Sequence, residues 1–257
     1  MGLGSKGPAG ITLEARKYLE RATVVMGYKL YIDQAEPWLS PLVKRFSTNM
    51  TEETQRGEEA LEEAMKGSKV ALVSGGDPGI YAMAGVVYEL AAGKKIPLGP
   101  GKDQLLIRVI PGTPALVAAA SLLGAPITHD FATISLSDRL TDWELILKRL
   151  DAASQADFVI VIYNPRSHGR DWQLGEVKEL LLKNLKGETP VGLATRLGRH
   201  GEASKIVSLK DLNPEEVDMQ TILIVGNSTT FIYEGSMITP RGYLKKYGPG
   251  KRFEGGE

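Results

Sequence analysis

The chain has 257 residues, of which 42% are hydrophobic and 24% are charged, as is usual for a soluble globular protein with a substantial core. Basic and acidic residues each number 31, so the near-zero net charge argues against a general nucleic-acid or membrane-surface binder. The chain has no cysteine, which excludes disulfides, zinc–thiolate sites, iron–sulfur ligation and a cysteine nucleophile.

Strand-like and helix-like patterns alternate along the first half of the chain. In chain order we predict a helix over 12–22 with Thr12 as its N-cap, a strand over 23–28, a helix over 51–66 with Thr51 as its N-cap, a strand over 69–73, a helix over 78–92, a strand over 105–110 and a small-residue helix after PGTP. This order is typical of a parallel α/β sheet.

A second series of elements follows a domain boundary that we place near 111–113. It comprises a strand over 131–136, a helix over 141–153, a strand over 158–163, a helix over 171–185 and strands over 191–195, 204–207 and 221–226. We therefore expect two α/β domains, 1–112 with a mainly parallel sheet and 113–243 with a mixed sheet and late hairpin-like pieces. A flexible polar tail is expected over 244–257.

No apolar run approaches the ~18 residues of a membrane span. The first residues, MGLGSKGPAGITLEARKYL, lack the apolar core of a signal peptide. Together with the absence of cysteine, these features fit a cytoplasmic protein, which is our expectation.

The stretch VSGGDPGIY, 73–81, joins a predicted strand to a predicted helix through a glycine turn, as in a nucleotide site. It matches neither GxGxxG nor GxxxxGK. A carboxylate here would repel a pyrophosphate but suit ribose hydroxyls or a cationic ligand. Asp77 therefore disfavours NAD and ATP and favours S-adenosylmethionine, a sulfonium without phosphate. The alternative is that Asp77 only caps the helix, with Pro78 at its first position.

Two further small-residue stretches accompany this turn. GLGSKGPAGIT, 2–12, would face the same crevice if it followed a first strand, but only Met1 precedes it. VIPGTPALVAAASLLGAP, 109–126, predicts a helix whose small residues favour close packing at the domain junction more than ligand contact.

Polar stretches follow two consecutive predicted strands of the second half, YNPRSHGR over 163–170 and TRLGRHGE over 195–202. Because ligands bind at strand ends of open sheets, arginines there are candidates for gripping substrate carboxylates, although each singly also fits a solvated surface position. The candidates are Arg166, Arg170, Arg196 and Arg199.

The histidines are His129, His168 and His200, too scattered in sequence to predict a metal site. His129 adjoins Asp130, a pairing that fits either a tuned acid or base or a structural hydrogen-bonded pair.

Together these stretches resemble the tetrapyrrole methylase family of cobalamin biosynthesis. The resemblance is carried by SGGDPGIYAMA (74–84), VIPGTPA (109–115) and ITPRGY (238–243). The chain is most similar to the branch of precorrin-3B and cobalt-factor III C-17 methyltransferases, through GYKLYID (27–33), GAPITHDFATISLSD (124–138), WELILKRLDAASQADFVIVIYNPRS (143–167) and VGNS (225–228). The resemblance extends to about Tyr243.

The resemblance implies a homodimer whose subunits hold S-adenosylmethionine between two α/β domains, with the tetrapyrrole in an adjoining trough. Matching motif positions imply cofactor contacts from Gly75, Asp77, Ile80, Tyr81, Thr113, Pro114 and Ala115, and from Tyr163, Leu197 and Thr221 in the second domain.

The chain departs from the family pattern at two places. The apolar strand that usually precedes the first glycine loop is absent and the loop reads GSKGP, so we leave Ser5, Lys6 and Gly7 out of the predicted site. Relatives carry a small hydroxyl residue or alanine where Pro114 stands, and proline has no N–H to donate to a cofactor.

Methyl transfer from a sulfonium is an in-line displacement, so alignment matters more than a strong base. Ring contraction, which this branch couples to methylation, also needs proton transfers, for which His129, Asp130 and Asp138 are candidates that spacing does not separate. The alternatives are a sister methylase acting on another ring carbon, an inactive homologue, and a protein methyltransferase of the diphthamide type. The segments THDFATISLSD and YNPRS argue against the last, by resemblance.

Overall fold

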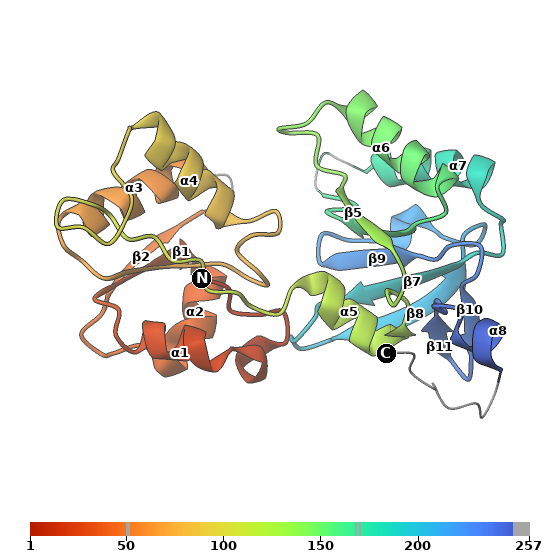
Figure 1. Ribbon diagram of the computed structural model, residues 1–257, viewed down its shortest axis with the longest axis horizontal. Helices are drawn as coiled ribbons and strands as arrows, with labels where there is room; N and C mark the ends of the chain where they lie inside the picture. The colour runs from red at the N-terminus through yellow and green to blue at the C-terminus, as the bar shows by residue number, and fades with distance from the viewer. Residues whose placement is uncertain (50–51, 168, 170, 249–257) are drawn as a thin grey trace, which may run out of the picture. The chain divides into compact units, whose positions relative to one another are not determined.

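The structure, a computed structural model, describes residues 1–49, 52–167, 169 and 171–248. The chain forms two compact units (Figure 1). Unit 1 comprises Met1–Ala118 together with Leu197–His200, and unit 2 comprises Ala119–Arg196 together with Gly201–Glu257. Among the helices of the described residues, none combines the length and the apolar character that a bilayer span requires.

Unit 1 is built on a three-stranded sheet of order β2-β1-β3, in which both pairings are parallel, as the sequence predicted. The strands are β1 (Val24–Tyr28), β2 (Lys44–Thr48) and β3 (Val70–Val73). Helices α1 (Leu13–Leu19) and α2 (Lys29–Ala35) cover one face, and α3 (Glu53–Met65) and α4 (Met83–Gly93) cover the other (Figure 1). Short 3-10 turns lie at Gly7–Gly10 and Glu36–Trp38.

The core of unit 1 follows the apolar periodicity of its elements. Thr12 caps α1 as predicted, because its hydroxyl accepts a hydrogen bond from the Ala15 amide at 3.1 Å. Leu19, Val25 and Ile32 are buried in one cluster beneath the sheet. Strand β2 was not predicted, since it lies at the sheet edge with its residues largely exposed and carries no apolar alternation. The predicted cap Thr51 lies outside the described residues.

The predicted strand over 105–110 does not form. Among the described residues this segment has only an isolated bridge between Leu98 and Leu105, and one hydrogen bond from the Gly2 amide to the Ile110 carbonyl at 2.9 Å. The prediction was wrong because an apolar sequence needs a neighbouring strand to pair with along its length.

The first residues of the chain instead pair with the end of β3. The Leu3 amide donates to the Ser74 carbonyl, and the Ser74 amide donates to the Met1 carbonyl, both at 3.0 Å. Leu3 is 1% exposed. Backbone pairing and one buried leucine therefore hold this segment beside β3 without an apolar run.

Unit 2 contains the predicted mixed sheet, which has five strands in the order β5-β6-β9-β7-β8. Its strands are β5 (Phe131–Ser135), β6 (Val159–Tyr163), β7 (Pro190–Thr195), β8 (Ala203–Ser208) and β9 (Thr221–Val225). Strands β5 and β6 are parallel, whereas β6–β9, β9–β7 and β7–β8 are antiparallel. Helices α6 (Trp143–Gln155) and α7 (Gln173–Asn184) cover one face of this sheet, and α5 (Ala115–Leu123) lies on the other (Figure 1).

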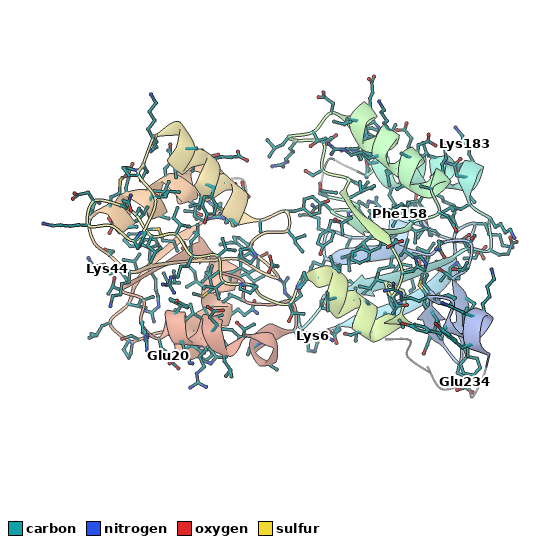
Figure 2. The ribbon with its side chains drawn as sticks, viewed as in Figure 1. Lys6, Glu20, Lys44, Phe158, Lys183 and Glu234 are labelled. Atoms are coloured by element: carbon teal, nitrogen blue, oxygen red, sulfur yellow. The ribbon has the colours of Figure 1, made fainter. Side chains whose placement is uncertain are left out.

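A smaller sheet of order β10-β11-β4 completes unit 2. It is formed by β4 (Gly124–Ala125), β10 (Phe231–Tyr233) and β11 (Ser236–Ile238), and the last two make the expected late hairpin, with Glu234 at its turn (Figure 2). A 3-10 turn lies at Pro214–Glu216, and α8 (Tyr243–Tyr247) follows the hairpin. The predicted tail thus begins within α8, and residues 249–257 lie outside the described part of the chain.

Candidate functional site

Loops from distant parts of the sequence meet at the carboxyl end of β3 in unit 1. The Gly4 amide donates to the Gly76 carbonyl at 3.1 Å, and the Ser5 amide donates to the Thr113 carbonyl at 2.9 Å. The N-terminal loop therefore joins the GGDPG loop to the PGTP loop. The carboxyl ends of parallel strands are where open α/β sheets bind ligands, so these joined loops are the candidate site.

Asp77 fastens the GGDPG loop to the PGTP loop. Its Oδ1 accepts a hydrogen bond from the Gly79 amide at 2.8 Å, and its Oδ2 accepts one from the Gly112 amide at 3.1 Å. Gly112 is buried, so Asp77 satisfies an amide that would otherwise lack a partner within the protein. The side chain thus fixes the shape of both loops.

Helix α4 begins later than predicted, and Asp77 does not cap it. The helix starts at Met83, and the residue before it, Ala82, offers no capping side chain. Between Asp77 and α4 the backbone of Tyr81 adopts φ of 50°, in the left-handed region that non-glycine residues seldom occupy. The loop therefore extends to Ala82, and the capping interpretation of Asp77 was wrong because its carboxylate is engaged within the loops.

Two glycines make the close approach of these loops possible. Gly76 has φ of 62°, and a Cβ there would lie 3.2 Å from the Ser5 hydroxyl oxygen. A Cβ at Gly112 would collide with the Gly76 carbonyl oxygen and would lie 2.8 Å from the Gly4 amide nitrogen. Any larger side chain at Gly112 would push the loops apart.

Tyr31 and Ser5 belong to this site although the sequence analysis did not select them. A Cβ at Gly75 would lie 2.6 Å from the Tyr31 ring, so this α2 side chain packs against the loop backbone. The Tyr31 ring also contacts Tyr28 edge-on, with centroids 5.8 Å apart. The only signal for Tyr31 was its place in GYKLYID, and the pairing of Ser5 spans more than a hundred residues, which sequence pattern alone does not reveal.

The predicted residue Leu197 also belongs to unit 1, within the segment Leu197–His200. This segment meets the N-terminal loop through two glycine backbones: a Cβ at Gly7 would lie 2.5 Å from the Gly198 carbonyl oxygen. Leu197 is half-buried, whereas Arg199 is exposed. The loop that we had excluded from the site, including Lys6 (Figure 2), is thus in contact with a predicted site segment.

Pro114 lies immediately before the first residue of α5 and accepts the first hydrogen bonds of that helix. Its carbonyl accepts hydrogen bonds from the amides of Val117 and Ala118, both at 3.1 Å. A residue at a helix start has no intrahelical acceptor for its own amide, so proline costs the helix nothing there. Ala115 is the first residue of α5, and Thr113 precedes the turn.

In unit 2 most predicted residues lie at one end of the strands of the large sheet. Asp138 follows β5, and Tyr163 ends β6. Arg196 follows β7, and Thr221 begins the antiparallel β9, so all four lie at the same end of the strands. The Thr221 hydroxyl already bonds to Asp218 Oδ1 at 2.7 Å and to the Thr195 hydroxyl at 3.0 Å.

The predicted arginines differ in their freedom to bind a substrate. Arg166 donates from Nη1 to the Pro214 carbonyl at 3.0 Å, so its guanidinium is partly engaged within unit 2. Arg196 is exposed and adopts φ of 53°. Arg170 and His168 lie outside the described residues, and His200 is exposed in unit 1.

The candidate proton-transfer residues do not lie together. His129 and Asp130 precede β5, whereas Asp138 follows it. They therefore lie at opposite ends of this strand, whose five residues span roughly 17 Å. His129 Nδ1 accepts a hydrogen bond from the Asp130 amide at 2.7 Å. Of the three candidates, only Asp138 lies at the same end of the strands as Tyr163 and Arg196.

Gln173 holds Asp138 and was missed in the sequence. It is 1% exposed at the start of α7, and its Nε2 donates to Asp138 Oδ2 at 3.2 Å. Its Oε1 is buried and has no partner among the described protein groups. A buried amide oxygen without a partner among the described residues, next to a carboxylate, makes this end of the sheet a candidate site.

Both the sheet topology and the position of the loops define an α/β protein with a ligand site at the carboxyl ends of parallel strands. The family model of the Tetrapyrrole (Corrin/Porphyrin) Methylases matches residues 1–213. The chain therefore belongs to the tetrapyrrole methylase family.

Individual proteins give the same result. A probable cobalt-factor III C(17)-methyltransferase of Salmonella typhimurium is 45% identical over 250 residues, covering 95% of this chain and 98% of that protein. A cobalt-factor III methyltransferase of Priestia megaterium is 45% identical over 247 residues, and the match spans 96% of this chain but 45% of that longer protein. The crystal structure of the methyltransferase CobJ superposes with a TM-score of 0.86 at 34% identity, covering 93% of this chain and 97% of that one.

Proposed function

We propose that this chain is an S-adenosylmethionine-dependent methyltransferase of cobalamin biosynthesis that methylates C-17 of cobalt-factor III or precorrin-3B. The observation that carries the proposal is the set of loops joined by Asp77 and Gly112, in a chain that matches the Salmonella relative over nearly the whole length of both proteins. The family defines the methyl transfer, and the C-17 position is inferred from the similarity to that relative.

The loops of unit 1 fit the proposed cofactor. They form a glycine-lined backbone surface fixed by the Asp77 carboxylate, and the GGDPG loop itself matches neither of the phosphate-binding glycine motifs, although residues 2–7 read GLGSKG. We assign Gly75, Asp77, Ile80, Tyr81 and the Thr113–Ala115 turn to cofactor binding, together with Tyr31, Ser5 and Leu197. Tyr163 and Thr221 are weaker candidates, because the Thr221 hydroxyl already has two partners.

When bound, S-adenosylmethionine supplies an electrophilic methyl group on a sulfonium, and the macrocycle supplies an electron-rich carbon. The protein then contributes alignment, which for a displacement of this kind lowers the barrier by fixing distance and angle. Asp77 performs this role by holding two loops in one arrangement. Arg166, Arg170, Arg196 and Arg199 are the proposed partners of the peripheral carboxylates of the macrocycle.

For the proton transfers that ring contraction needs, we propose Asp138 rather than His129 or Asp130. Asp138 lies at the same end of the strands as Tyr163 and Arg196, and the Gln173 amide donates a hydrogen bond to its carboxylate. Replacing Gln173 with leucine is expected to lower kcat about tenfold while the KM for the cofactor stays unchanged, since the lost bond to a charged group is worth about 1.5 kcal/mol. The matched control is Gln155→Leu, which removes an exposed hydrogen bond from the Gln155 side-chain amide to Asp151.

The test is label transfer from S-adenosyl-[methyl-¹⁴C]methionine to each of the two tetrapyrroles in separate incubations. Label in the tetrapyrrole supports the proposal, and the ratio of kcat/KM for cobalt-factor III and precorrin-3B assigns the natural substrate. If the folded protein binds the cofactor and transfers no label to either, the proposal fails in favour of an inactive homologue or a methylase with another substrate.

A further inference from the structure

A buried arginine, Arg56, lies between α3 and α4 in unit 1. The two helices lie side by side on one face of the sheet (Figure 1). They approach each other closely beside Arg56, since a Cβ at Gly57 would lie 2.7 Å from the Leu90 side chain on α4. Arg56 is 5% exposed, so its guanidinium is enclosed where the helices meet.

The guanidinium of Arg56 joins the end of β2 to the start of α4. Its Nε donates to the Thr48 hydroxyl at 2.5 Å, and its Nη2 donates to the Asn49 carbonyl at 2.6 Å. Its Nη1 lies 3.7 Å from Met83 Sδ, a hydrogen bond to sulfur. Thr48 is the last residue of β2, and Met83 is the first residue of α4. Both therefore lie at the carboxyl end of the parallel strands, where the candidate site is.

Within the part of the chain that the structure describes, no carboxylate pairs with this guanidinium. Glu52, one helical turn before Arg56, instead accepts hydrogen bonds from the Asn49 amide and side chain at 2.7 and 3.1 Å. These bonds are the main reason why the pKa of Glu52 lies below its usual value, and the charge of Arg56 is the smallest of the causes. Burying an unpaired cation is costly, and an apolar side chain of similar volume would fill this space at lower cost. The arginine adds a rigid fork of donors that fixes three groups relative to one another.

The loop between β3 and α4 is held at both ends. Asp77 fastens its first part, and Met83 at its end lies against Arg56. Between these two points Tyr81 has φ of 50°, a strained conformation that persists only where the surroundings hold it. Ala82 has no capping side chain, so the start of α4 depends on contacts such as that between Met83 and Arg56.

We propose that Arg56 is a positioning residue for the cofactor. It acts through Met83 to hold the start of α4, and thereby keeps Ile80 and Tyr81 in the arrangement that binds S-adenosylmethionine. This inference rests on the proposed function, which assigns Ile80 and Tyr81 to the cofactor. Because Arg56 is buried between helices, its effect on the ligand is indirect. A buried polar contact of this kind selects one arrangement of the chain more than it adds stability.

The first test replaces Arg56 and measures cofactor binding by isothermal titration calorimetry. Arg56→Met keeps the aliphatic volume, removes every guanidinium bond and should raise the Kd for S-adenosylmethionine about tenfold. The kcat at saturating cofactor should stay within about twofold of the parent, since the loss is one of binding. Arg56→Lys keeps the charge and should restore part of the affinity. Arg45→Met removes a more exposed arginine, bonded to Glu36 near the other end of β2, and is the matched control that should bind like the parent.

The second test asks whether Arg56 acts through Met83. Met83→Leu removes the sulfur acceptor at nearly the same volume, so this variant is expected to fold. It should raise the Kd for the cofactor about threefold in the parent and have no further effect in the Arg56→Met background, because the two residues share one contact. Additive losses in this double-mutant cycle, or a parental Kd in Met83→Leu, overturn the proposal even where Arg56→Met does not fold.

Hydrogen exchange without any ligand separates positioning from general stabilisation. Arg56→Met should speed amide exchange over 77–86 at least about fivefold and leave β1 unchanged. Uniform acceleration across unit 1 overturns the positioning role in favour of a purely stabilising one. A folded Arg56→Met protein with the parental Kd overturns this inference and leaves the proposed function intact, whereas a parent chain that binds no S-adenosylmethionine overturns both.

Discussion

At the scale of single residues, the role of Asp77 is the point on which sequence and structure differ most. The sequence identified the residue but left two roles open, helix cap and cofactor ligand. The structure excludes the cap, since both carboxylate oxygens accept backbone amides within the loops. The decisive partner, Gly112, is 35 residues away, and such pairings do not follow from local pattern.

We predict that replacing Asp77 weakens cofactor binding by deforming the loops. Asp77→Ala leaves the buried Gly112 amide without its acceptor, which costs about 1–3 kcal/mol, or roughly fivefold to 150-fold in Kd if the cost falls on the bound state. Asp77→Asn keeps one carbonyl acceptor and should have an intermediate effect.

The measurement is isothermal titration with S-adenosylmethionine. Glu20→Gln, an exposed acid on the surface of unit 1 (Figure 2), is the matched control and should bind like the parent. Parental affinity in both Asp77 variants would show that the loops keep their shape without this side chain.

Gly112 provides a second test at this scale. Gly112→Ala places a methyl group against the Gly76 carbonyl and should abolish measurable cofactor binding, with a lower melting temperature. Gly85→Ala on α4 meets no atom within 4 Å and should leave binding unchanged while stabilising the helix by up to about 1 kcal/mol. Cofactor binding by the Gly112 variant at parental affinity would contradict the described packing of the loops.

At the scale of elements, strands with long buried runs were predictable and edge segments were not. FVIVIY predicted β6, and its residues Val159–Ile162 are essentially inaccessible to solvent. Strand β2 forms although its sequence lacks apolar alternation, whereas the segment over 105–110 is mostly apolar and forms no full ladder. Burial on both faces leaves a signal in the sequence, whereas position at an edge does not.

The central strands of unit 2 should carry much of its stability. Ile162→Ala removes a side chain that is 1% exposed, and we expect a loss of about 2–5 kcal/mol in the free energy of unfolding. Ile232→Ala on β10, which is 52% exposed, should change it by less than about 1 kcal/mol. Urea unfolding followed by tryptophan fluorescence measures both, and similar losses would contradict the assigned core.

At the scale of the whole molecule, the alternation of elements predicted two α/β units, a parallel sheet in the first and a mixed sheet in the second. It did not predict that Leu197–His200 would belong to unit 1, because that assignment depends on contacts such as the approach of the Gly7 and Gly198 backbones. The candidate site was therefore only partly predictable. Its glycine loops were found from their motifs, whereas Tyr31, Ser5 and Gln173 required the folded chain.

The central claim is that the joined loops serve methyl transfer to one ring carbon, C-17. The most direct measurement is ¹³C NMR of the tetrapyrrole product formed with S-adenosyl-[methyl-¹³C]methionine, with Gly112→Ala as the negative control. The account predicts a single enriched methyl signal at C-17 in the parent and none in the variant. Enrichment at another ring carbon, or equal enrichment by the Gly112 variant, would contradict it.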